Sequence, residues 1–141
     1  MKRLLLALAL TCPFVLDSCG HATVGTQPNS PQTTVAQLNK TVADANLAGV
    51  KTVIGLRDSG KITQAVTDNI ENYLALVATT SKSIGVILQK PEAWTAQKAE
   101  ILTLLATVTA PTIATTIDPG AQAVVTQIVT LLNQIKTQVV P

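Results

Sequence analysis

The chain has few of the side chains that perform most enzyme chemistry. Of its 141 residues only 2% are aromatic, one is a histidine and two are cysteines. His21 lies outside the predicted helical part, where a general base or a zinc ligand has no fixed geometry. Serine and threonine are abundant, but no histidine in the helical part could activate them as nucleophiles. The sequence therefore predicts neither an enzyme nor a metal or cofactor site.

Charged residues are also scarce, at 13% of the chain. Removal of residues 1–18 would leave eight basic and seven acidic residues, a nearly neutral balance. Nucleic acid is bound by basic patches that displace counterions, so it is not an expected partner. The deficit is greatest between Ile101 and Ile135, where Asp118 is the only charged residue. We call the surface formed by this segment the 101–135 face. It could be a neutral polar surface, or it could pack against a partner, another copy or a membrane surface.

The first nineteen residues have the plan of a secretory signal peptide. Lys2 and Arg3 provide a basic start, and residues 4–10 form an apolar run that Leu16 extends. The small Ser18 then precedes Cys19. This order of basic, apolar and small residues is typical of exported proteins.

The end of this leader resembles the lipobox of bacterial lipoproteins. That motif has a branched apolar residue, a free position, a small residue and then cysteine, and Leu16, Ser18 and Cys19 match it. The resemblance implies that Cys19 is lipidated. Gly20 follows in place of the aspartate that holds such proteins at the inner membrane, which implies the outer membrane, facing the periplasm.

Two other interpretations of the leader stay open. The small residue that ends Gly20-His21-Ala22 could serve conventional cleavage, which would give a secreted protein without lipid. An uncleaved anchor is disfavoured, because the apolar run is shorter than the roughly 20 residues of a spanning helix. Both cysteines lie in or directly after the leader, so the mature domain has no disulfide framework.

The chain divides into a signal peptide (1–18), the lipid-anchor cysteine with a flexible linker (19–32), and a helical domain (33–141). Residues 20–32 mix glycine, proline, threonine and asparagine without an apolar period, which is typical of a tether. The remainder is rich in aliphatic residues and long enough for one hydrophobic core.

Four stretches of the domain show helical periodicity, with apolar residues at steps of three and four. Turn signals separate them. Ser30-Pro31 opens the first helix, and Asp58-Ser59-Gly60 ends it. Thr63 caps the second helix, and Lys90-Pro91 ends the second and begins the third. Asp118-Pro119 opens the fourth. Residues 112–117 are rich in threonine and isoleucine and could form a short extended piece. We predict an all-α fold, an antiparallel up-down four-helix bundle.

Each predicted helix has an apolar stripe. The stripe of the first helix is Val35, Leu38, Val42, Ala45, Gly49, Val53 and Leu56, widened by Leu47, Val50 and Ile54, and that of the second is Val66, Ile70, Tyr73, Val77, Ser81, Ile84 and Leu88. The stripe of the third is Trp94, Lys98, Ile101, Leu105 and Val108, and that of the fourth is Ala121, Val124, Ile128, Leu131, Ile135 and Val139.

One segment matches the opening of a phosphate-binding loop. Residues 55–61 fit the pattern GxxxxGK, but Ile62 occupies the position where the motif needs serine or threonine for magnesium. Gly55 also lies in a helical pattern and does not follow a strand. We therefore interpret Gly60 as a helix stop and not as part of a nucleotide site.

Tyr73 and Trp94 are the remaining candidate site residues. They could line a pocket for an apolar ligand, or they could close a core made of small aliphatic side chains. Asp68, Glu71 and Asn72 are better explained as a solvated polar face near a helix start.

The sequence favours a lipid-anchored structural or interaction protein of a bacterial or phage-encoded cell envelope. Its expected contacts are the membrane, through Cys19, and another copy or an envelope protein, through the 101–135 face. The alternative is a module that binds an apolar ligand between its helices.

Overall fold

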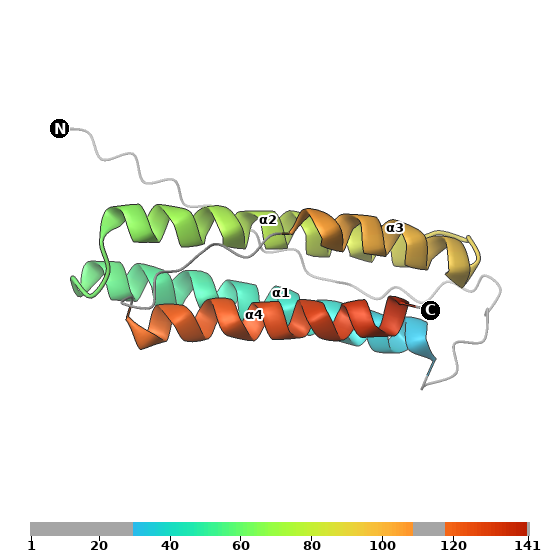
Figure 1. Ribbon diagram of the computed structural model, residues 1–141, viewed down its shortest axis with the longest axis horizontal. Coiled ribbons are helices and arrows are strands. Elements are labelled where there is room, and N and C mark those ends of the chain that lie inside the picture. The colour runs from blue at the N-terminus through green and yellow to red at the C-terminus, as the bar shows by residue number, and fades with distance from the viewer. Residues whose placement is uncertain (1–29, 109–117, 141) are drawn as a thin grey trace, which may run out of the picture.

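The computed structural model describes residues 30–108 and 118–140, which form four helices (Figure 1). No strand occurs in these two ranges, and the all-α prediction is confirmed. The helices are α1 (Pro31–Asp58), α2 (Gln64–Gln89), α3 (Trp94–Thr107) and α4 (Pro119–Val139). The first helix thus begins at the Ser30-Pro31 signal, two residues before the predicted domain boundary at residue 33.

Three predicted capping residues start three of the helices. The side chain of Ser30 accepts a hydrogen bond from the backbone N–H of Thr33 at 3.2 Å. Thr63 caps α2 in the same way, and Asp118 accepts from the N–H of Gly120 at 2.8 Å. Each cap satisfies a backbone donor that has no partner within its helix. Gly60 follows α1 with a φ of 71°, the left-handed conformation predicted for a helix stop.

Consecutive helices run in opposite directions (Figure 1). Gly49, in the second half of α1, lies against Val124, near the start of α4. In the α1–α2 hairpin, Asn39 donates to the carbonyl of Ser81 at 2.9 Å, and the Ser81 hydroxyl bonds back to the Asn39 amide oxygen at 2.9 Å. With 14 residues, α3 is much shorter than α1, α2 and α4, which have 28, 26 and 21.

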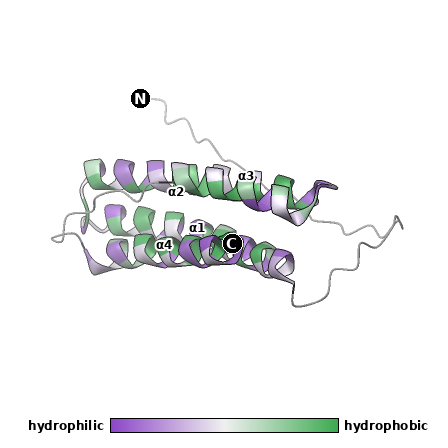
Figure 2. Cartoon of the chain, turned by 45° about the vertical axis from the view of Figure 1, so that its right-hand side comes forward, coloured by the Kyte–Doolittle hydropathy of each residue, from purple (hydrophilic) through white to green (hydrophobic). Residues whose placement is uncertain are grey.

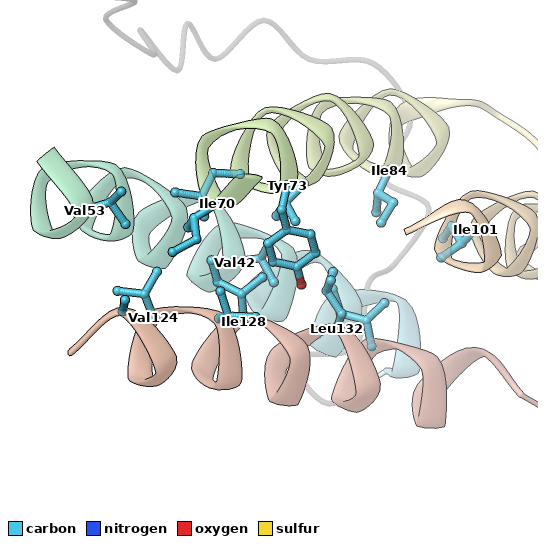
Figure 3. Packing of buried hydrophobic residues seen from close by; sticks show 14 of the residues in the cluster. Val42, Val53, Ile70, Tyr73, Ile84, Ile101, Val124, Ile128 and Leu132 are labelled. Atoms are coloured by element: carbon cyan, nitrogen blue, oxygen red, sulfur yellow. The ribbon is translucent and has the colours of Figure 1, made fainter. Parts of the chain in front are cut away.

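The core is built almost entirely from aliphatic side chains (Figure 3). In Figure 2, hydrophobic and hydrophilic residues alternate around the helices, as expected when only one face of each is buried. The predicted stripes of α2 and α4 are largely confirmed. Leu131 is an exception, because it is only half-buried while its neighbour Leu132 takes the buried position. Fully buried residues include Ile70, Ile84, Ile101, Ile128 and Ile135.

Two residues predicted to widen the stripe of α1 are exposed. Leu47 is 60% exposed and Ile54 is 36% exposed, whereas Val42 and Val53 are fully buried. A helix that packs on α2 and α4 buries only the side chains between those neighbours. The prediction that Leu47 and Ile54 join the core is therefore wrong.

The third helix does not begin at Pro91 as predicted. It begins at Trp94, after an extended Ala93 that provides no side-chain cap. The side-chain amide of Gln97 donates to the carbonyl of Lys90 at 2.9 Å, which holds residues 90–93 as a bend across the start of α3.

The same Gln97 is fully buried, a position that the sequence did not indicate. Its amide oxygen accepts a hydrogen bond from Gln32 of α1 at 2.8 Å, so it joins α1, α3 and the α2–α3 connection. A buried amide with both functions satisfied avoids the desolvation penalty of an unpaired polar group. In α3 only Gln97 and Ile101 are buried, and the predicted stripe members Leu105 and Val108 are half-buried.

Candidate functional site

The described residues contain no cluster that could hold a metal ion. No three histidine, cysteine, aspartate or glutamate residues gather in residues 30–108 and 118–140 in a way that could hold a metal ion. None of the helices in these ranges is long and apolar enough to cross a membrane. Cys19 and His21 lie outside the described residues, as does the possible extended piece at 112–117.

The segment that matches GxxxxGK is a helix end followed by a turn. Gly55 lies within α1, and Lys61 is an exposed residue after the left-handed Gly60. The N–H groups of Gly60 and Lys61 bond to the carbonyls of Arg57 and Leu56 at 2.9 Å. Because these donors close the helix end, they are not directed at a phosphate. This geometry agrees with the interpretation of Gly60 as a helix stop.

The polar residues near the start of α2 do not form a carboxylate pair. Asp68 is exposed and accepts a hydrogen bond from Gln64 at 2.7 Å, one helical turn away. Asn72 is exposed and Glu71 is half-buried. The arrangement agrees with a solvated face.

Tyr73 and Asn46 are the two described residues that bury a side-chain polar atom without a hydrogen-bond partner. Tyr73 is the one that lies beside a hollow. It is only 4% exposed, and its ring points from α2 toward α4 (Figure 3). Within the described residues this hydroxyl has no hydrogen-bond partner. Most buried polar atoms are paired, since an unpaired one has lost its bonds to water without replacement. Burial also raises the pKa of Tyr73 above its ordinary value of about 10, so the group is a neutral donor at physiological pH.

A cavity of about 380 Å³ adjoins this tyrosine. Its volume is within the range of about 300–1,000 Å³ that is usual for small-molecule pockets. It lies where the end of α3 faces α2 and α4, and we call it the Tyr73 cavity. It is lined by Tyr73, Leu105, Ala106, Val108, Val129, Leu132, Asn133 and Lys136.

Trp94 does not line the Tyr73 cavity. It begins α3, whereas the cavity lies at the other end of that helix, and its side chain is half-buried against the core. The structure therefore brings one of the two candidate aromatic residues to a pocket and leaves the other as a packing residue.

Two polar residues of the Tyr73 cavity were missed in the sequence. Asn133 and Lys136 are exposed on α4. One feature of the sequence could have drawn attention to Lys136. It is isolated from other charges, because Asp118 is the only other charged residue after Ile101. Among the residues described, no carboxylate forms an ion pair with Lys136.

A second hollow lies between α2 and α3, with a volume of about 500 Å³. At its edge the Lys90 ammonium bonds to Glu100 at 2.7 Å and approaches Glu92 at 3.9 Å. The hydrogen bond between Lys90 and Glu100 raises the pKa of Lys90 and lowers that of Glu100. These charges pair with each other and join Lys90, which follows α2, to the middle of α3. The lining is Lys82, Ser83, Val86, Ile87, Lys90, Glu100, Thr103 and Leu104.

The outer surfaces of α4 and of the part of α3 after Glu100 are polar but nearly uncharged. Several threonines there donate their hydroxyl protons to their own helix: Thr103 to Ala99 at 3.0 Å, and Thr130 to Thr126 at 2.9 Å. Exposed residues of the 101–135 face include Thr103, Ala106, Thr107, Ala123, Thr126, Gln127, Thr130, Asn133 and Gln134.

A comparison of the chain with models of known protein families, with characterised proteins and with solved structures finds no match. Any function must therefore be argued from the residues of this chain.

The titration of Tyr73 provides a direct test of its burial. It is the only tyrosine, so the ultraviolet absorbance of phenolate reports this group alone. We expect the native protein to form phenolate at higher pH than the denatured chain, because burial disfavours the charged form. Above about pH 10 the native state then holds a proton that the unfolded state has released, so stability falls as pH rises.

Tyr73→Phe should reduce this alkaline loss of stability. The variant should still lose the stability that comes from Lys90. The raised pKa of Lys90 also makes stability fall as pH rises, and in the same pH range. Coincident phenolate titrations of native and denatured protein would contradict the assignment.

Proposed function

We propose that this protein is exported, is anchored through lipid on Cys19 to the periplasmic side of the outer membrane, and acts there as a helical interaction module. The lipobox-like sequence before Cys19 supports the anchor. The observation that carries the interaction role is the scarcity of charge on the 101–135 face, where Asp118 alone is charged.

The contrast between α1 and α4 supports this role. The exposed surface of α1 has the charges usual for a solvated helix, for example the Lys40–Asp44 pair at 3.0 Å. On α4, exposed positions between Ala123 and Gln134 hold only alanine, threonine, glutamine and asparagine. Burial of a neutral polar surface in an interface avoids the large desolvation cost of charge. We propose that this face binds another copy of the chain or an envelope protein.

The anchor is tested by the intact mass of protein extracted from membranes. We expect the leader to be absent and acyl chains to be present on Cys19. Cys19→Ala should release the protein from the membrane or block its processing. An unmodified chain that begins at Thr23 would replace lipidation with ordinary secretion.

The interaction face is tested by one added charge. Thr130→Lys should weaken self-association or capture of an envelope partner, because a buried ammonium without a counterion is costly. The matched control is Thr41→Lys on α1, since Thr41 is also exposed and also donates its hydroxyl to the carbonyl four residues earlier. Both variants should keep the parent helix content. Sedimentation and crosslinking in intact envelopes give the measurement, and equal association of both variants with the parent would refute the proposal.

A further inference from the structure

The Tyr73 cavity has features that a neutral interaction module does not require. Its inner wall includes a 96%-buried tyrosine whose hydroxyl has no partner among the described residues. A packing role alone would be served as well by phenylalanine, which buries the same ring without an unpaired oxygen. The hydroxyl therefore points to a missing acceptor.

The remaining lining indicates the chemistry of that acceptor. Leu105, Val108, Val129 and Leu132 provide apolar walls from α3 and α4. The only charged lining residue is Lys136, a cation without a carboxylate partner in the described part of the chain. An apolar wall with one unpaired cation fits a ligand with an apolar body and one negative charge.

Helical geometry places the polar groups on one side of the cavity. Lys136 and Leu132 are four residues apart, so they lie on the same face of α4. Side chains of a helix lean toward its N-terminus, which directs the lysine over the turn that contains Leu132. The ring of Tyr73 points toward α4 (Figure 3), and Tyr73 and Leu132 line the same cavity. Asn133 adds an amide donor from the neighbouring position.

We infer that the Tyr73 cavity binds a small carboxylate with an apolar body, such as a medium-chain fatty acid. Its carboxylate accepts a hydrogen bond from the Tyr73 hydroxyl and pairs with the Lys136 ammonium, and its chain lies against Leu105, Val108 and Val129. The hydroxyl oxygen is closed to solvent in the structure. Binding therefore requires a neighbouring side chain to move, and Leu132 lines the same cavity. This binding role goes beyond the proposed interaction function and does not depend on it.

The test uses octanoate as probe and 1-octanol as its uncharged counterpart. The protein is titrated by calorimetry in the form in which it is isolated. If it carries lipid, it is held in nanodiscs, and titrations of empty nanodiscs remove the contribution of partition into lipid. We expect saturable binding of octanoate to the parent. Tyr73→Phe should bind octanoate about tenfold more weakly, the usual effect of a lost hydrogen bond to a charged group. Its helix content and melting temperature should not fall.

Charge recognition has its own control. Lys136→Gln should weaken octanoate binding several-fold and leave octanol binding unchanged, while Lys51→Gln, an exposed lysine of α1, should change neither. Saturating octanoate should also move the phenolate titration of the parent to higher pH, because a nearby carboxylate disfavours a second negative charge. Absence of saturable binding to the parent at millimolar octanoate, or equal affinity of Tyr73→Phe and the parent, would overturn the proposal.

Discussion

Ile128→Ala is expected to cost about 2–5 kcal/mol of unfolding free energy, the usual range for truncation of a fully buried isoleucine. Ile128 is fully buried in the middle of α4, where a cavity would have core side chains on several sides. Small domains have about 5–15 kcal/mol in total, so the loss would be a large part of the stability. Urea unfolding followed by circular dichroism gives the measurement.

Leu47→Ala is the control for this truncation. Leu47 is 60% exposed on α1, so its truncation should change stability by about 0.5 kcal/mol or less. Leu105 and Leu131, which the helical pattern also assigned to the core, are half-buried and should give intermediate losses. Equal losses at Ile128 and Leu47 would show that the core is not where the structure places it.

Two glycines of the same helix should respond to alanine with opposite signs. A Cβ added at Gly49 would lie 2.7 Å from a methyl carbon of Val124, closer than packed carbon atoms approach. Relief of this overlap requires α1 and α4 to separate or Val124 to move. We expect Gly49→Ala to destabilise by about 1–3 kcal/mol, the usual cost of overpacking.

Gly55→Ala should stabilise the protein by about 0.5–1 kcal/mol. A Cβ there would meet nothing within 4 Å, so only the better helix propensity of alanine remains. Gly49→Ala should cost less stability in a Val124→Ala background than in the parent, and the double-mutant cycle measures this coupling. If Gly49→Ala and Gly55→Ala stabilise equally, α1 and α4 are not in close contact at Gly49.

The helices could be predicted because their signals are local. Ser30, Thr63 and Asp118 cap the helices that follow them because cap bonds reach only two or three residues along the chain. The left-handed conformation of Gly60 was also readable, since few other residues adopt it cheaply. Apolar periodicity identified most of the buried residues for the same reason.

The features that could not be predicted depend on contacts between residues far apart in the sequence. Gln97 is buried because Gln32, sixty-five positions earlier, pairs with it, and no local pattern shows that partner. Leu47 is exposed because none of the four described helices covers that side of α1. Periodicity could not show whether Tyr73 and Trp94 line the same pocket. Their separation depends on where α3 begins and ends. The length of α3 places its final turn, and not Trp94, beside Tyr73.

The threonine hydroxyls of α3 and α4 have a consequence for what can bind there. Because Thr103 and Thr130 give their protons to carbonyls of their own helix, each presents a methyl group and an oxygen that can only accept. At these positions the surface offers lone pairs and no polar hydrogens. A complementary surface would therefore supply donors, such as arginine or amide side chains, and small apolar groups to meet the methyls. Two copies that aligned their threonines would leave oxygen facing oxygen, so self-association would require a register that sets threonine opposite glutamine or asparagine.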